Sequence, residues 1–259
     1  MNMILNYGND SVAGFNALLD RYSLNHFNSP KRSTVPLLAY WKEPERVLAC
    51  LTRFGLHAPD TLTLAFEYDV PVQEGKGPPS CTDLMILGQN LAVAVEAKYT
   101  EPVYETVKEW LRKDYSENKR AVLKGWLSLI NQTTGSQLTH TDVMDLAYQA
   151  IHRAASACFP LKGEPGVSRF MVYLLFTDAE AAPQKITRDL AVLRKLIPPD
   201  SLRFACVTIR LEKKPAFTAL EDRWTREKER LLRDDVMEGL RQDLFFEFSE
   251  PVVSDGMLT

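Results

Sequence analysis

Residues 66–102, FEYDVPVQEGKGPPSCTDLMILGQNLAVAVEAKYTEP, contain the pattern that decides the fold. Two apolar runs, Leu84–Leu87 and Leu91–Val95, flank the polar break Gly88-Gln89-Asn90. Strand, turn residues and strand in that order are typical of a β-hairpin. The second strand is apolar on both faces, which predicts that it lies inside a sheet covered on both sides by helices.

Charged residues stand at the end of this hairpin away from the turn. If the turn centres on Gln89-Asn90, Asp83 lies opposite Glu96, and Lys98 shares a face with Glu96 because alternate strand residues point the same way. Glu67 lies in the preceding strand-like run. Buried carboxylates are costly unless a cation joins them, and opposed acidic oxygens suit Mg²⁺ or Mn²⁺. A lysine beside such an ion could position water or stabilise charge on a phosphate.

Asp83 followed by Glu96-Ala97-Lys98 resembles the motif of the PD-(D/E)XK nuclease superfamily, with Ser80-Cys81-Thr82 before the aspartate. The resemblance covers about residues 43–178. It implies an α/β fold with a restriction-endonuclease-like mixed sheet flanked by helices. It also implies that Asp83, Glu96 and the Ala97 carbonyl hold Mg²⁺ or Mn²⁺, that Lys98 assists the attack of water, and that Glu67 completes the metal shell.

Other Glu-x-Lys triplets in the chain serve as internal comparisons. Glu74-Gly75-Lys76 falls in a Gly- and Pro-rich loop, and Glu117-Asn118-Lys119 falls between expected helices. Glu212-Lys213-Lys214 also follows a strand-like run, but no hairpin partner sets an aspartate opposite it. The triplet at Glu96 is therefore favoured as a site over a pair of edge charges.

A helix is expected over Thr141–Cys158, with an apolar stripe on one face and Gln149 and Arg153 one turn apart on another. Several families of the superfamily place a Gln or Tyr from this helix beside the metal, which makes Gln149 an auxiliary candidate. A solvated polar face is the alternative. The Gln-x-x-x-Tyr pattern of one branch is not met, because Arg153 stands where its Tyr would be.

The remaining patterns predict a succession of helices and strands. A strand, a helix and a strand near the end should extend the sheet by a parallel crossover. The tail from Pro251 is expected to be loose. The expected elements are helices at Ser11–Tyr22, from Glu43 to Gly55, at Pro102–Tyr115, Lys119–Asn131, Gln184–Leu196 and Ala219–Leu244, and strands at Leu62–Val72, Arg169–Thr177 and Arg203–Leu211.

Composition is that of an ordinary globular protein, with 45% apolar and 25% charged residues. The chain is expected to form one domain over 1–259, with a core at about 43–212 and a helical extension at about 219–244. No run of about 20 apolar residues occurs, and the four scattered cysteines suit reduced core thiols, so a cytoplasmic protein without a membrane partner is predicted. A net charge of −3 gives no general attraction to nucleic acid.

The resemblance, together with the placement of Asp83, Glu96 and Lys98, implies a metal-dependent nuclease that hydrolyses phosphodiester bonds of nucleic acid, with DNA favoured, in restriction, repair or defence. An alternative is an interaction or nucleic-acid-binding module of the same fold without catalysis. A third interpretation is a hydrolase of another phosphorylated ligand. The charged C-terminal helix packs either across the domain or against a second chain, which leaves a homodimer open.

Overall fold

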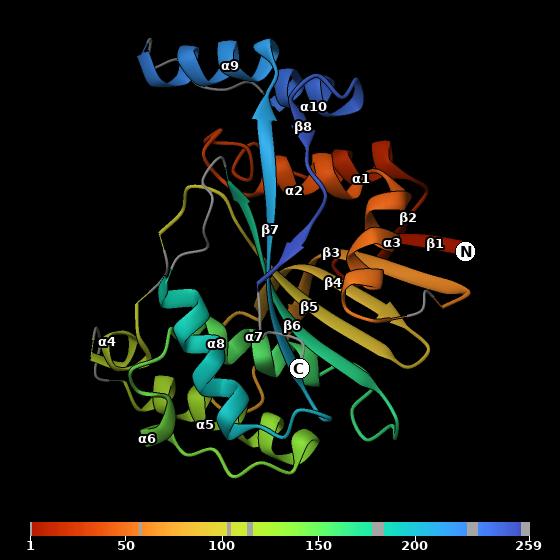
Figure 1. Ribbon diagram of the computed structural model, residues 1–259. Helices are drawn as coiled ribbons and strands as arrows, with labels where there is room; N and C mark the ends of the chain where they lie inside the picture. The colour runs from red at the N-terminus through yellow and green to blue at the C-terminus, as the bar shows by residue number, and fades with distance from the viewer. Residues whose placement is uncertain are drawn as a thin grey trace.

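The computed structural model describes residues 2–56, 59–102, 105–112, 116–177, 184–226 and 233–254. The fold is mixed α/β, as predicted, and is built on a nine-stranded sheet in the order β2-β1-β3-β4-β5-β6-β7-β8, with β9 also paired to β7 (Figure 1). The strands are β1 (Asn2–Tyr7), β2 (Asp10–Val12), β3 (Thr61–Val70), β4 (Ser80–Gly88), β5 (Leu91–Lys98), β6 (Ser168–Thr177), β7 (Arg203–Lys213), β8 (Phe246–Phe248) and β9 (Val252–Val253). The helices are α1 (Phe15–Arg21), α2 (Thr34–Trp41), α3 (Pro44–Arg53), α4 (Val107–Arg112), α5 (Glu117–Thr134), α6 (His140–Val143), α7 (Tyr148–Cys158), α8 (Gln184–Leu196), α9 (Pro215–Arg226) and α10 (Arg233–Arg241).

The centre of the sheet combines an antiparallel hairpin with parallel strands. β3, β4 and β5 are antiparallel neighbours, whereas β5, β6 and β7 run parallel. The chain passes from β6 to β7 through α8, which confirms the predicted strand–helix–strand crossover. The predicted hairpin is also confirmed.

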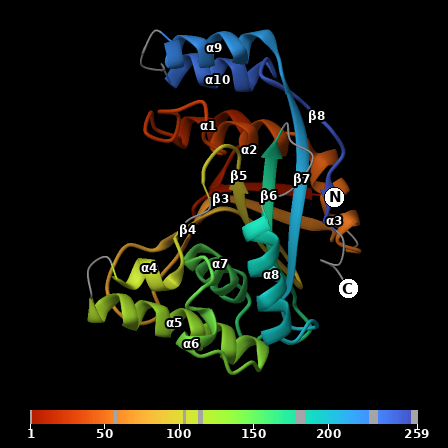
Figure 2. The same ribbon diagram turned by 60° about the vertical axis from the view of Figure 1, so that its left-hand side comes forward.

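Helices cover the sheet on both faces, and each face has its own apolar core (Figures 1 and 2). One core unites side chains of α1, α2, α3, α9 and α10 with Leu84 and Ile86 of β4. The other unites α5, α7 and α8 with Met85 and with Ala94 of β5. Alternation along the strands therefore feeds both layers, which explains why β5 is apolar on both sides.

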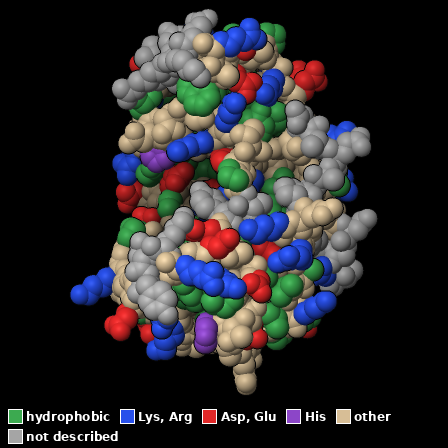
Figure 3. Space-filling model, turned by 90° about the vertical axis from the view of Figure 1, so that its left-hand side faces the viewer, with side chains coloured by type: hydrophobic (Ala, Val, Ile, Leu, Met, Phe, Trp, Pro, Cys, Tyr) green, Lys and Arg blue, Asp and Glu red, His purple; other side chains and the backbone are tan. Residues whose placement is uncertain are grey.

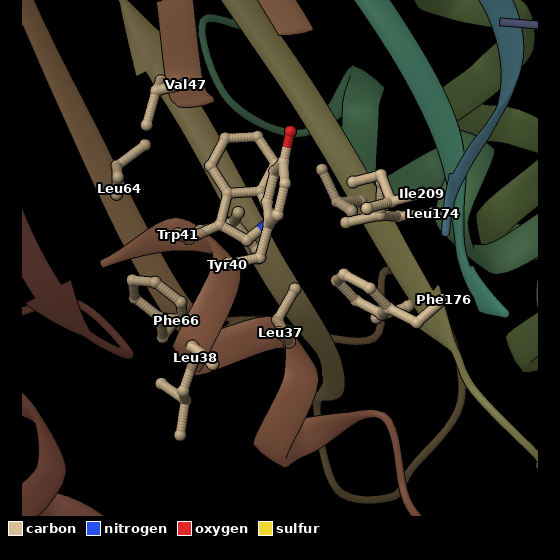
Figure 4. Close-up of a cluster of buried hydrophobic side chains, with 14 of the residues drawn as sticks. Leu37, Leu38, Tyr40, Trp41, Val47, Leu64, Phe66, Leu174, Phe176 and Ile209 are labelled. Carbon is tan, nitrogen blue, oxygen red and sulfur yellow. The ribbon is translucent and has the colours of Figure 1, made fainter. Parts of the chain in front are cut away.

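In the first core, α2 lies across the sheet. Figure 4 shows Leu37 and Tyr40 of this helix on the side of Leu174 and Phe176 of β6, and Trp41 on the side of Leu64 of β3. The Tyr40 and Phe176 rings meet edge to face with centroids 6.0 Å apart.

On the opposite face, α5 packs closely on the loop that follows β3. A Cβ at Gly125 would lie 2.6 Å from the backbone nitrogen of Glu74, so only glycine permits this approach. The contact fixes α5 beside the hairpin and, through α5, supports α7.

The structure corrects several expectations for helices. The single helix over Thr141–Cys158 is wrong: α6 ends at Val143 and α7 begins at Tyr148. Between them, the Ala147 amide donates to Asp189 of α8 at 2.9 Å, and Ala147 also bridges to Thr106. These tertiary partners replace helical hydrogen bonds.

Both ends of the chain also differ from expectation. β2 occupies the start of the helix expected at Ser11–Tyr22, and β1 and α2 were not predicted. The helix expected over Ala219–Leu244 consists of α9 and α10, with 227–232 outside the described residues. The tail expected to be loose contributes β9. The helix expected at Pro102–Tyr115 is described only as α4, since 103–104 and 113–115 lie outside the described residues.

None of the helices among the described residues has both the length and the apolar character that a bilayer span requires.

Candidate functional site

The predicted hairpin register is confirmed. Pairs run from Gly88 with Leu91 to Leu84 with Val95, and the same register would next set Asp83 opposite Glu96. At this position a side chain takes part in the hydrogen bonding between the strands: Oδ2 of Asp83 accepts a hydrogen bond from the Ala97 amide at 2.7 Å. Asp83 thus stands where the two strands begin to separate, at the end of the hairpin predicted to carry the site.

The neighbouring strand is irregular at the same level. Glu67 adopts a positive φ of 50°, between the pairs Phe66 with Leu84 and Tyr68 with Thr82. Phe66 packs into the core of the α1–α3 side and Tyr68 against the opposite core, so the strand's alternation switches at Glu67. A non-glycine residue in this region stores strain, which is typical of functional positions.

The Glu67 side chain is hydrogen bonded on β4. Its Oε2 accepts a bond from the Cys81 thiol at 3.0 Å. Glu67 is one of the charges that raise the pKa of Asp83, so the two carboxylates are electrostatically coupled.

On the face of the sheet covered by α7, Glu96 is the centre of a buried polar cluster. Oε1 of Glu96 accepts hydrogen bonds from Lys98 Nζ at 2.9 Å and from Gln149 Nε2, and Oε2 accepts one from Arg153 Nε. Glu96, Lys98, Gln149 and Arg153 are 2%, 6%, 6% and 4% exposed. We call these four residues the Glu96 cluster. Glu96 and Lys98 share a face, as predicted, and Gln149 is not on a solvated face.

Arg153 also joins the cluster to β4. Its Nη1 donates to Ser80 Oγ at 3.0 Å and to Thr82 Oγ1 at 3.3 Å. Sequence reasoning did not assign Arg153 to the site, although its i, i+4 spacing from Gln149 carried the signal. One guanidinium therefore ties β4, β5 and α7 together.

His152 lies beside this contact. Its Nδ1 is 2.6 Å from Ser80 Oγ and 3.4 Å from Arg153 Nη1. Arginine can only donate, so Nδ1 is the accepting nitrogen and Nε2 carries the proton. In this tautomer His152 is not a metal ligand at either nitrogen. Its ring stacks between those of Trp126 and Tyr148.

The comparisons with known proteins gave one match. Residues 12–210 match a family model described as a domain of unknown function, DUF6946. The chain belongs to this family. No curated protein and no solved structure matches the chain. The DUF6946 region contains Glu67, Asp83, the Glu96 cluster and the whole hairpin, and it stops before α9 and α10.

Electrostatics in the DUF6946 site are dominated by burial. Burial, followed by the charge of Glu96, raises the pKa of Asp83 well above its ordinary value, although Arg153 and the Ala97 amide oppose this. Burial disfavours the charged Arg153 side chain, but Glu96 and Asp83 outweigh it and raise the guanidinium pKa. Burial and then Arg153 and Lys98 lower the pKa of His152. The imidazole is therefore neutral near pH 7.

Glu67, Asp83 and Glu96 are electrostatically coupled, and Glu96 is paired with two buried cations, Arg153 and Lys98. Burial is the largest cause of the raised Asp83 pKa, followed by the charge of Glu96. A cation bound beside Asp83 would favour its charged form and so lower this pKa.

The carboxylates at this site meet some of the requirements of a metal ion. Within the described ranges, no group of three or more His, Cys, Asp or Glu side chains could hold a metal ion. Mg²⁺, however, is commonly held by one or two carboxylates, with water and substrate phosphate completing the shell. Asp83 is only partly buried and fits this role. Glu96 could serve an ion only in competition with Arg153, Gln149 and Lys98.

The chain beyond Lys98 packs against the loop that precedes α2. Glu101 accepts hydrogen bonds from the Ser33 amide at 2.6 Å and hydroxyl at 2.9 Å, and Thr100 donates to the Lys31 carbonyl at 2.8 Å. These bonds hold the basic pair Lys31-Arg32 near the end of β5. Figure 3 shows a hollow across this side of the molecule, with acidic side chains at its edge.

Proposed function

We propose that this DUF6946 protein is a metal-dependent nuclease with a restriction-endonuclease-like fold, acting on nucleic acid and favouring DNA. The observation that carries the proposal is the pairing of Glu96 with Lys98 on one sheet face, next to Asp83 at the open end of the hairpin. Few structural needs explain a buried Glu-x-Lys pair at a strand end, since hydrophobic residues of similar volume would be at least as stable there.

In this proposal Asp83, Glu96 and the Ala97 carbonyl hold Mg²⁺ or Mn²⁺, with Glu67 as a further acidic residue. The ion would supply Lewis acidity toward the scissile phosphate. Lys98 stabilises negative charge developing on the phosphate, in a water-poor site where such an interaction is strong. Gln149 and Arg153 orient the Glu96 carboxylate, and Arg153 also positions β4 through Ser80.

A second candidate is a module that binds nucleic acid or protein without catalysis. It is favoured by the hydrogen bonding of Glu96, whose two oxygens accept bonds from Lys98, Gln149 and Arg153 and so need no metal. Biological role, cytoplasmic location and a homodimer stay predictions.

Incubation of purified protein with single- and double-stranded DNA and RNA separates the two functions. A nuclease cuts at least one of these with Mn²⁺ or Mg²⁺, and chelation of the metal stops it. Asp83→Asn should abolish cutting, whereas Lys76→Ala, in an exposed Glu-x-Lys triplet, should not. Absence of cutting of all four substrates by the wild type would leave the binding module.

A further inference from the structure

A cavity of about 680 Å³ lies along α5, away from the Glu96 cluster. It is lined by α5 from Arg120 to Gln132, by the end of the loop 135–139, by His140 of α6 and Met144 just after it, and by Leu111 of α4. Its apolar lining consists of Leu111, Leu123, Leu127, Leu138 and Met144.

The wall formed by the loop 135–139 is fixed before any ligand binds. Asn131 of α5 donates to the Leu138 carbonyl at 3.0 Å and accepts from the Leu138 amide at 2.8 Å and from Ser136 at 2.9 Å. A reciprocal capping box between Thr139 and Asp142 then sets the start of α6. A preformed wall lowers the ordering cost of binding.

The charged side chains of the lining, Arg120 and Lys124, are both basic, and no Asp or Glu is among the described lining residues. Lys124 pairs with Glu74 at 2.9 Å, but both side chains are solvent exposed, so this pair contributes little and an anion could replace it. A basic lining on a chain of net charge −3 points to an anionic ligand.

We propose that this cavity binds a small amphiphilic anion, with an apolar chain against the leucines and a carboxylate or similar head group at Arg120 and Lys124. The volume falls in the range of about 300–1,000 Å³ that is usual for small-molecule sites. The proposal does not depend on the nuclease function.

Decanoate, below its micellar concentration, is the test ligand, and decyltrimethylammonium is the control with the same chain length and the opposite charge. Titration calorimetry of the full chain should give saturable one-to-one binding of decanoate and much weaker binding of the cation. Intrinsic fluorescence should change as well, because Trp110 precedes Leu111 and Trp126 precedes Leu127 in the lining.

Two variants locate the binding. Lys124→Glu, at an exposed position, should weaken decanoate binding about fivefold, the upper range for one exposed ion pair. Arg53→Glu, an equal charge change on α3, should leave it unchanged. Ser128→Trp fills the cavity and should abolish binding; if that variant fails to fold, the Lys124 comparison decides. The proposal is overturned if neither amphiphile saturates, if both bind alike, or if Lys124→Glu binds as well as Arg53→Glu.

Discussion

Lys98 and His152 show how burial changes what a single residue can do. Lys98 lies at the end of β5, as expected, and is buried against Glu96. His152 is neutral because burial and two neighbouring cations oppose its protonation. Variants of either residue must therefore be tested for their effect on the free energy of unfolding.

Lys98→Met should lower cleavage on the order of 10²–10⁴-fold, because methionine keeps the packing volume but removes the charge that would stabilise the transition state. Initial cleavage rates with Mn²⁺, measured on protein shown to be folded by circular dichroism, check this. Lys76→Met is the matched control and should retain wild-type rates. Equal rates for Lys98→Met and wild type would remove Lys98 from the mechanism.

His152 predicts a pH dependence of stability. Its pKa is lowered in the native state, so the native protein binds this proton more weakly than the unfolded chain does. The contribution of neutral His152 to the free energy of unfolding is fully present above the unfolded-chain pKa of about 6.5. It is lost as the pH falls below that value, at about 1.4 kcal/mol per pH unit. Urea unfolding should therefore show that wild type loses stability relative to His152→Gln below pH 6.5. Parallel stability curves for wild type and His152→Gln would contradict this account.

At the scale of elements, the Glu96 cluster is the polar part of the contact between α7 and the hairpin. Gln149 and Arg153 project from adjacent turns of α7, and Arg153 reaches both β5 and β4. The break before α7, where Ala147 bonds to Asp189, sets where this helix begins. Helix position and site geometry are thus fixed by the same tertiary contacts.

Arg153→Met should lower the free energy of unfolding by about 3 kcal/mol, because it leaves the buried Glu96 charge with fewer partners. Adding Glu96→Gln should recover much of this loss, since the uncompensated charge then disappears. Urea unfolding of the two single variants and the double variant measures the coupling. Arg53→Met, at an exposed arginine of α3, should cost far less. Additive losses from Arg153→Met and Glu96→Gln would contradict this account.

Across the whole molecule, two helical layers enclose a sheet that carries the coupled carboxylates of Glu67, Asp83 and Glu96. A bound cation would stabilise the native state by mass action, by about 2.7 kcal/mol at a hundredfold excess over Kd. Mg²⁺ or Mn²⁺ should therefore raise the melting temperature of the wild type. Asp83→Asn should abolish that increment. The same metal-induced shift in both proteins, recorded by differential scanning fluorimetry, would place the ion elsewhere.

The sequence alone determined the elements whose signals are local. The hairpin and its register followed from two apolar runs and a short polar turn, and α8 lies at the residues where periodicity placed it. The mixed α/β class followed from the order of these elements. The placement of Glu96 and Lys98 on one face also needed only the two-residue period of a strand.

Tertiary structure decided what depends on partners distant in sequence. β1 adds to the sheet through β3, some 59 residues further along the chain, and no periodicity marks it as a strand. The break between α6 and α7 depends on Asp189, and the left-handed Glu67 depends on how β3 and β4 pair. Arg153 reaches Glu96 only because α7 packs on β5. A buried Glu96 carboxylate is costly without a cation, so the residues that neutralise it are those that the tertiary structure brings near.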